Sequence, residues 1–175
     1  MKRLNLPLSE KDIESLVCGE QVYLSGTIYT ARDAAHARMI SLLNNNESLP
    51  FDINNQTIYY VGPTPSKEDG SFGSAGPTTS SRMDKYTPTL LDLGLKGMIG
   101  KGYRNEEVKQ AIVKHKAVYF VAAGGAGAIL GKCVKKHKVI AFDDLLSEAI
   151  QELYIEDFPV FVGIDSKGND IYDRD

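Results

Sequence analysis

The sequence predicts an α/β fold in which strands and helices form layers. Strand-like segments alternate with helix-like segments along most of the 175 residues, which is the pattern of a layered α/β domain. One strand-like segment, residues 117–123, is almost entirely apolar, as is typical of a central strand covered on both faces. Hydrophobic residues make up 42% of the chain and charged residues 25%, so a packed core is expected. We expect a polar, adaptable lead-in over residues 1–19 and a single domain over residues 20–175.

The individual elements are predicted from residue spacing and from turn and capping residues. Short β-rich or apolar runs predict strands at residues 21–29, 58–61, 98–102, 117–123, 139–142 and 158–165. Helical spacing and capping residues predict helices at residues 30–43, 87–94, 106–114, 127–136 and 143–152. Thr30 and Asp33 have the spacing of a capping box at the start of the first of these helices. The segment 64–81 is rich in Gly, Pro, Ser and Thr and predicts a long loop, a kind of segment that is often functional.

Composition excludes several classes of protein. The 20 Lys and Arg residues against 23 Asp and Glu give a net charge of −3, which argues against a nucleic-acid binder. No apolar run approaches the roughly 20 residues that span a bilayer, and the N-terminal segment turns polar and acidic, unlike a signal peptide. Cys18 and Cys133 are the only cysteines, and an iron–sulfur cubane usually needs three or four thiolates. We therefore expect a cytoplasmic protein with reduced thiols and no membrane partner.

The strongest candidate for a binding site is the hydroxyl-rich segment 73–84. Four consecutive hydroxyl residues, Thr78 to Ser81, lie between glycines and Arg82. Hydroxyl groups, exposed backbone N–H groups and a guanidinium together suit a carboxylate or a phosphate. The alternative is a polar surface loop without a ligand.

Two further cations are candidates for the same chemistry. Arg32 lies in the first turn of a predicted helix, where a positive charge is unfavourable for the helix dipole unless an anion is bound. Lys101 lies between Gly100 and Gly102 at a strand end, where ligands bind in α/β sheets. For both residues the alternative is a solvated side chain. His36, four residues after Arg32, is expected to make a local hydrogen bond, with a catalytic role as the weaker alternative.

The glycine-rich turn 124–127 resembles a dinucleotide-binding turn but departs from it. The third glycine of that pattern is missing because residue 130 is Leu. The phosphate-loop pattern also fails, since residue 126 is Ala and Cys133 follows Lys132. We favour tight packing between helix and sheet as the reason for these glycines.

Four blocks of this sequence resemble one known family. Residues 25–36, 76–84, 100–102 and 123–128 are similar to the β subunit, or C-terminal domain, of class I fumarate hydratases and L-tartrate dehydratases. The resemblance runs from about residue 20 to 165 and implies a swivelling β/β/α domain with a layered mixed sheet and helices. Ser81 stands where the family pattern has Gly, which leaves the side chains named below untouched.

The resemblance also implies an activity and a set of roles. Thr78 would be the general base, Arg82 and Arg32 would bind the substrate carboxylates, and Lys101 would be a third cation. The reaction would be reversible hydration of fumarate to L-malate. A [4Fe-4S] cluster would be held by a partner α subunit, in a homodimer or heterotetramer. A dicarboxylate carries two negative charges, which two arginines and a lysine can neutralise and orient.

Three alternatives remain open from the sequence. An L-tartrate dehydratase β subunit would use the same cations. A stand-alone module that binds dicarboxylates would need no partner. A dinucleotide-binding protein would depend on the glycine-rich turn. A threonine hydroxyl is a poor base in water, so Thr78 would need help that this sequence does not show, and we expect that help from the α subunit.

Overall fold

The structure, a computed structural model, describes residues 2–122 and 127–173, and their strands form one mixed sheet. The strand order in the described part is β1-β2-β3-β4-β5-β7-β6, and β7 also pairs with β2. The strands are β1 (Lys2–Asn5), β2 (Gln21–Thr30), β3 (Thr57–Tyr59), β4 (Gly97–Gly100), β5 (Val118–Val121), β6 (Val134–Ala141) and β7 (Ile150–Ile164). Because β7 joins β2 on one side and β5 on the other, strands β2, β3, β4, β5 and β7 form a closed ring. The predicted α/β class with a mixed sheet is confirmed.

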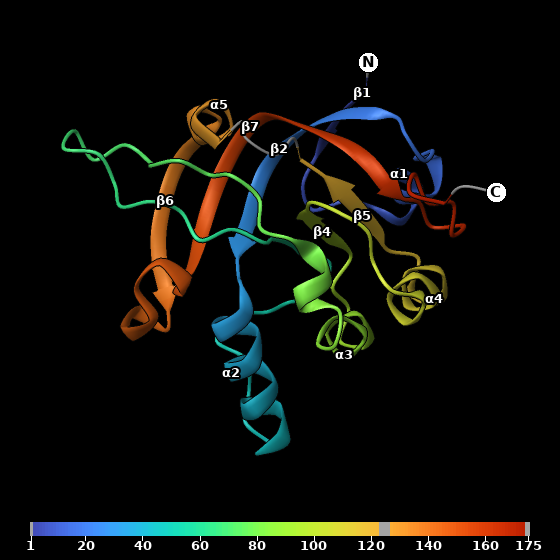
Figure 1. The fold of residues 1–175 in the computed structure, drawn as a ribbon, viewed down its shortest axis with the longest axis horizontal. Coiled ribbons are helices and arrows are strands. Elements are labelled where there is room, and N and C mark those ends of the chain that lie inside the picture. The colour runs from blue at the N-terminus through green and yellow to red at the C-terminus, as the bar shows by residue number, and fades with distance from the viewer. Residues whose placement is uncertain (1, 123–126, 174–175) are drawn as a thin grey trace.

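The described helices pack against the strands of this ring in two hydrophobic clusters. They are α1 (Glu10–Ser15), α2 (Asp33–Asn44), α3 (Thr87–Asp92), α4 (Glu106–His115) and α5 (Gly127–Lys132), with two 3-10 segments, η1 (Ser80–Met83) and η2 (Asp143–Glu148). Figure 1 shows α2, α3 and α4 together on one side of the strands. Their buried side chains form one hydrophobic cluster with β3 and β4, and residues from β2, β5 and β7 form the main part of a second cluster. None of the described helices is long and apolar enough to cross a membrane.

The N-terminal lead-in differs from its predicted character. Residues 2–5 form β1, which pairs in parallel with β2, and Ser9 makes a capping box with Asp12 at the start of α1. Ile13 of α1 is buried and belongs to the same hydrophobic cluster as β2. The segment is therefore an ordered part of the sheet, which its polar composition did not reveal.

The C-terminal third also differs from prediction. The helix predicted at 143–152 is wrong, because η2 ends at Glu148 and β7 begins at Ile150. The helix predicted to reach residue 136 ends at Lys132, and β6 begins at Val134. Antiparallel pairing of β6 with β7 satisfies the backbone N–H and C=O groups of both segments, so they form strands although their apolar residues are spaced as in a helix. The last strand is fifteen residues long, about twice its predicted length.

Strands β1 to β5 run parallel, so their carboxyl ends meet at one edge of the sheet. Ligands of α/β proteins bind at this edge. The residues that leave β2, β3 and β4 are therefore brought together by topology alone. They include the first turn of α2 and the start of the long loop after β3.

At Gly26, β2 approaches the N-terminal segment too closely for a side chain, and this can be tested by substitution. It lies where the register between β2 and β7 shifts, with φ +133, and a Cβ there would come within 2.9 Å of the Leu6 backbone oxygen. We expect Gly26→Ala to lower the free energy of unfolding by about 3 kcal/mol, since both strain and collision are introduced. Gly19 is the matched control, because it has φ +89 but nothing within 4 Å. Urea unfolding should show a loss of only about 1 kcal/mol for Gly19→Ala; equal losses would exclude the collision.

Candidate functional site

Arg32 lies just beyond β2, at the edge where the parallel strands end. It is the N-cap residue of α2 in extended geometry, and its side chain makes no capping hydrogen bond. The predicted capping box of Thr30 and Asp33 is wrong, since α2 begins only at Asp33. Thr30 is still paired within β2, and its hydroxyl accepts a hydrogen bond from the backbone N–H of Gln151 at 2.9 Å. Thr30 thus holds β7 instead of capping the helix.

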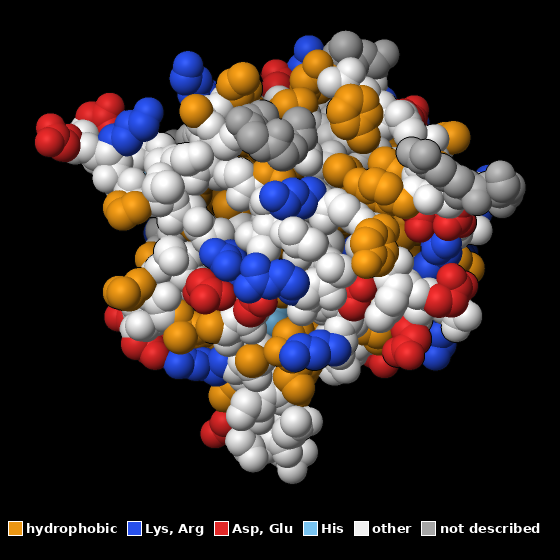
Figure 2. All heavy atoms as spheres, in the orientation of Figure 1, with side chains coloured by type: hydrophobic (Ala, Val, Ile, Leu, Met, Phe, Trp, Pro, Cys, Tyr) orange, Lys and Arg blue, Asp and Glu red, His pale blue; other side chains and the backbone are white. Residues whose placement is uncertain are grey.

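Arg82 and Arg32 converge on one carboxylate. Arg82 Nε donates to Asp33 Oδ2 at 2.9 Å, and Arg82 Nη2 lies 2.9 Å from the same oxygen. Arg32 Nε lies 3.9 Å from Asp33 Oδ1. The two arginines, 50 positions apart in sequence, therefore share one region of the surface. Figure 2 shows Lys and Arg side chains gathered with acidic side chains near the middle of this face.

The hydroxyl-rich segment is held against the ends of β3 and β4 by its backbone. Thr78 N donates to Tyr60 O at 2.8 Å, and Ser80 N donates to Lys101 O at 2.9 Å. A parallel bridge joins Thr79 to Lys101. Thr78 is half-buried and Lys101 is exposed. The structure therefore places Thr78, Arg82 and Lys101, together with Arg32, at the edge that topology predicts for a ligand.

Gly100 has a different use from the one predicted. A Cβ there would lie 2.8 Å from the Tyr60 ring and would collide with the Ser80 hydroxyl. The absence of a side chain at Gly100 lets Ser80 and Tyr60 pack against its backbone, whereas the sequence predicted room for a ligand there. Gly102 does have φ +86, and a Cβ added there would meet nothing within 4 Å.

Beneath this surface lies a buried ion pair that sequence reasoning missed. Arg104 Nε donates to Asp84 Oδ1 at 2.6 Å, and Arg104 Nη2 donates to Thr87 Oγ1 at 2.9 Å and to Tyr60 Oη at 3.2 Å. Asp84 Oδ2 accepts from the backbone N–H of Asn105 at 2.9 Å. The signal available was small: an arginine three residues after Lys101 and a carboxylate two residues after Arg82. Nothing in their spacing indicates that they meet.

Tyr119 extends this network towards Lys101. Its hydroxyl lies 2.7 Å from both Ser80 Oγ and Gly102 O, and its ring lies 4.9 Å from the Arg104 guanidinium carbon. Burial raises the pKa of Tyr119 well above its usual range, so the hydroxyl stays protonated. The network therefore contacts Ser80, two residues before Arg82, and Gly102, the residue after Lys101.

His36 makes the local hydrogen bond expected of it. The side chain is fully buried, and its Nδ1 lies 2.8 Å from Arg32 O. Burial lowers the pKa of His36 to about 4, so it is neutral at pH 7. This hydrogen bond from His36 holds the backbone carbonyl of Arg32 in place at the start of α2.

The glycine-rich turn 124–127 can be followed only at its end, because residues 123–126 lie outside the described residues. Gly127 packs against the start of the hydroxyl-rich segment, where a Cβ would collide with Ser74 Oγ. Ala75 N donates to Gly127 O at 3.0 Å. At the one glycine of the turn that is described, the close packing is therefore with the loop after β3, whereas the sequence predicted packing against the sheet.

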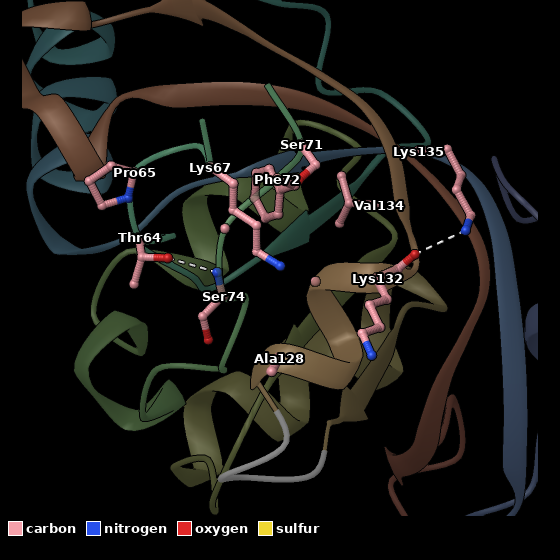
Figure 3. Close-up of a pocket in the computed structure, with 12 residues that line it drawn as sticks. Thr64, Pro65, Lys67, Ser71, Phe72, Ser74, Ala128, Lys132, Val134 and Lys135 are labelled. Atoms are coloured by element: carbon pink, nitrogen blue, oxygen red, sulfur yellow. Dashed lines mark hydrogen bonds between the residues drawn. The ribbon is translucent and has the colours of Figure 1, made fainter. Parts of the chain in front are cut away.

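One cavity lies apart from the four predicted residues. It has a volume of about 610 Å³ and lies between the long loop after β3 and the α5–β6 segment. Figure 3 shows Lys67, Lys132 and Lys135 among the residues lining it, and none of its lining residues is acidic. Arg32, Thr78, Arg82 and Lys101 do not line it.

The described residues do not fit an iron–sulfur cluster. Among residues 2–122 and 127–173, no three His, Cys, Asp or Glu side chains lie close enough to hold a metal ion. Burial raises the pKa of the Cys18 thiol and of the Cys133 thiol, which disfavours the thiolate that binds iron.

We expect the Arg104–Asp84 pair to be costly to break on one side only. Arg104→Met should lower the free energy of unfolding by about 3–5 kcal/mol, because Asp84 is left buried and unpaired. The double variant Arg104→Met with Asp84→Leu should recover most of that loss, as measured by urea unfolding. Equal losses in the single and the double variant would show that the unpaired charge is not the cause.

His36 predicts a dependence of stability on pH. The folded state keeps His36 neutral down to about pH 4, whereas an unfolded histidine takes up a proton near pH 6.5. The unfolded state thus binds more protons between these values, and stability falls as pH falls. Relative to His36→Gln, the protein should lose about 3 kcal/mol between pH 7 and pH 4 in urea unfolding. Parallel curves for the two proteins would contradict the neutral, buried His36.

Comparison with known proteins finds similar sequences along nearly the whole chain. A protein of Methanocaldococcus jannaschii named "Putative L(+)-tartrate dehydratase subunit beta" is 41% identical over 173 residues, covering 95% of this chain and 89% of that protein. Fumarate hydratase 2 of Leishmania major is 40% identical over 158 residues, covering 89% of this chain and 28% of that protein. Fumarate hydratase class I, aerobic, of Escherichia coli K12 is 37% identical over 175 residues, covering 98% of this chain and 32% of that protein.

This chain thus spans most of the first relative and less than a third of the two fumarate hydratases. The family model described as Fumarase C-terminus matches residues 1–175. The chain belongs to the Fumarase C-terminus family, which confirms the resemblance found in its four sequence blocks.

Proposed function

We propose that this chain is the β subunit of an iron–sulfur hydro-lyase that reversibly hydrates fumarate to L-malate. The observation that carries the proposal is the convergence of Arg32 and Arg82 on Asp33, at the edge that also bears Thr78 and Lys101. The names of the relatives support the same reaction class. A partner chain, in a homodimer or heterotetramer of such pairs, would complete the site.

In this proposal the cations bind and orient the substrate. Each guanidinium offers paired N–H donors that match a carboxylate, and the Lys101 ammonium adds a third positive charge. Removing the proton next to a carboxylate builds negative charge on that carboxylate. Fixed cations stabilise this charge in the transition state, so Arg32, Arg82 and Lys101 favour the reaction as well as binding.

Thr78 takes the proton in this proposal. Its backbone N–H is fixed by Tyr60 O, while its hydroxyl has no hydrogen bond to another described residue. That hydroxyl is thus left for a substrate or a partner group. A threonine hydroxyl is a poor base alone, so a group of the partner chain must lower its pKa or accept its proton.

The [4Fe-4S] cluster is assigned to the partner, since the described residues do not fit it. When bound there, it would supply an iron that acts as a Lewis acid. The roles proposed for this chain concern only binding, orientation and the proton at Thr78.

L-Tartrate is the second candidate substrate. The relative named as a tartrate dehydratase β subunit matches this chain along 89% of its own length, so it resembles this chain in extent as well as in sequence. The same cations would bind the two carboxylates of tartrate. Assaying the assembled pair on fumarate and on L-tartrate separates the two substrates, and tight binding of either by the chain alone would favour a stand-alone binding module.

Substitutions at the site test the proposal in the assembled enzyme. Thr78→Ala should lower kcat about 10²–10⁴-fold, because the base is lost while the backbone N–H that holds the segment remains. Arg32→Ala should lower kcat/KM about 10²–10³-fold, because a cation that stabilises developing charge is removed. Steady-state assays measure both values.

Neighbouring residues provide matched controls. Thr79→Ala removes an exposed hydroxyl next to Thr78, and Arg38→Ala removes a partly exposed arginine from the helix that follows Arg32. Both controls should stay within about threefold of the unsubstituted enzyme, as is usual for surface changes away from a site. Turnover at the unsubstituted level in Thr78→Ala would refute the role of this hydroxyl, provided that circular dichroism shows the same fold.

A further inference from the structure

We propose that Asp33 is a positioning residue that holds the guanidinium group of Arg82 ready for a dicarboxylate and takes up that of Arg32 when the ligand binds. This inference rests on the proposed function, because it concerns the same site. Asp33 is the first residue of α2, where the helix dipole favours a carboxylate. Its side chain stands between the two arginines that enter the site from different segments.

The contact with Arg82 fixes one edge of that guanidinium. Arg82 Nε and Nη2 both lie 2.9 Å from Asp33 Oδ2, which is the range of charge-assisted hydrogen bonds. An arginine has five N–H donors, so this contact leaves the remaining ones for a ligand. The Arg82 side chain is 52% exposed, and without the carboxylate it would be free to sample many rotamers.

Arg32 is confined but not yet bound to Asp33. Its Nε lies 3.9 Å from Asp33 Oδ1, which is too long for a hydrogen bond. Both atoms are buried and have no hydrogen-bond partner among the described residues. On its other side a Cβ at Gly62 would lie 2.7 Å from Arg32 Nη1, so the absent side chain there makes room for the guanidinium.

Buried donors and acceptors are rarely left unpaired, so this pair indicates an incomplete site. A small rotation of Arg32 on binding a ligand would close the gap and satisfy both atoms. Asp33 would then hold both arginines at once.

The charges favour the same conclusion. Two guanidinium groups that converge repel each other, and a carboxylate between them reduces that repulsion. Arg32, Arg82, Lys101 and Asp33 together carry a net charge of +2, and Glu148, whose carboxylate accepts from the backbone N–H of Ala34 at 3.0 Å, adds one more negative charge at the start of α2. A bare cluster of three cations would have to be held together by the fold alone.

The test compares two carboxylates that each pair with an arginine near α2. Asp33→Asn keeps the shape of the side chain but removes its charge. The control is Asp144→Asn, which removes the carboxylate that Arg38 of α2 contacts at 2.7 and 2.8 Å. Both ion pairs are partly exposed, so both substitutions should leave the fold and the melting temperature nearly unchanged.

In the assembled enzyme, Asp33→Asn should lower kcat/KM about 10- to 100-fold, mainly through a higher KM for the dicarboxylate. Asp144→Asn should stay within about twofold. Equal kcat/KM in the two variants would overturn the proposal.

A second readout does not depend on turnover. In the ¹⁵N-labelled chain the Arg82 Nε–H should give a slowly exchanging NMR signal, assigned by its loss in Arg82→Lys. That signal should shift and exchange faster in Asp33→Asn and stay unchanged in Asp144→Asn. An unchanged Arg82 signal in Asp33→Asn would overturn the positioning role even if activity fell. If the unsubstituted enzyme turned over neither dicarboxylate, the proposed function would fail, while the NMR signal would still decide whether Asp33 holds Arg82.

Discussion

The ion pair between Arg104 and Asp84 is the interaction on which the site depends. Both side chains are almost fully buried, and Arg104 also contacts Tyr60 and Thr87 by hydrogen bonds. Asp84 in turn accepts from the backbone at the start of α4. One pair therefore fixes the end of the hydroxyl-rich segment to the loop after β4. Since Tyr60 O accepts a hydrogen bond from Thr78 N, the same network also reaches the backbone of Thr78.

A buried ion pair is a weak source of net stability, because removing two charges from water costs nearly as much as their attraction returns. Its effect here is better understood as geometric. An unpaired Arg104 or Asp84 would be costly, so conformations that separate η1 from the loop after β4 are disfavoured. Gly100 adds to this constraint, because Ser80 and Tyr60 approach its backbone too closely for any side chain. The end of the hydroxyl-rich segment, from Ser80 to Asp84, is thus held in place by contacts with the end of β4 and with the loop after β4.

Local sequence signals predicted part of the fold and the place of the site. Helix α3 begins with Thr87-Pro88 and α4 follows Asn105, as expected, and each candidate cation lies where a strand or the hydroxyl-rich segment ends. The sequence could not predict β7, because Ile150 and Leu153 are three residues apart and fit a helix as well as a strand. Only long-range pairing with β2 and β6 decides between the two. The partnership of Arg104 with Asp84 is equally non-local, since 20 residues separate them and no period connects them.

The wrong prediction of a capping box at Thr30 and Asp33 shows that long-range contacts can override a local sequence pattern. A hydroxyl followed three positions later by a carboxylate is typical of a helix start, and α2 does begin two residues after the position that the pattern predicts. However, β2 extends to Thr30, whose hydroxyl is taken by β7, so the helix begins later than the pattern implies. The Asp33 carboxylate therefore lies at the N-terminus of α2, where Arg82 of η1 binds it. Asp33 suits a helix start by a local rule, but in the folded chain its carboxylate contacts Arg82. The contact joins residues 49 positions apart, so local sequence patterns could not predict it.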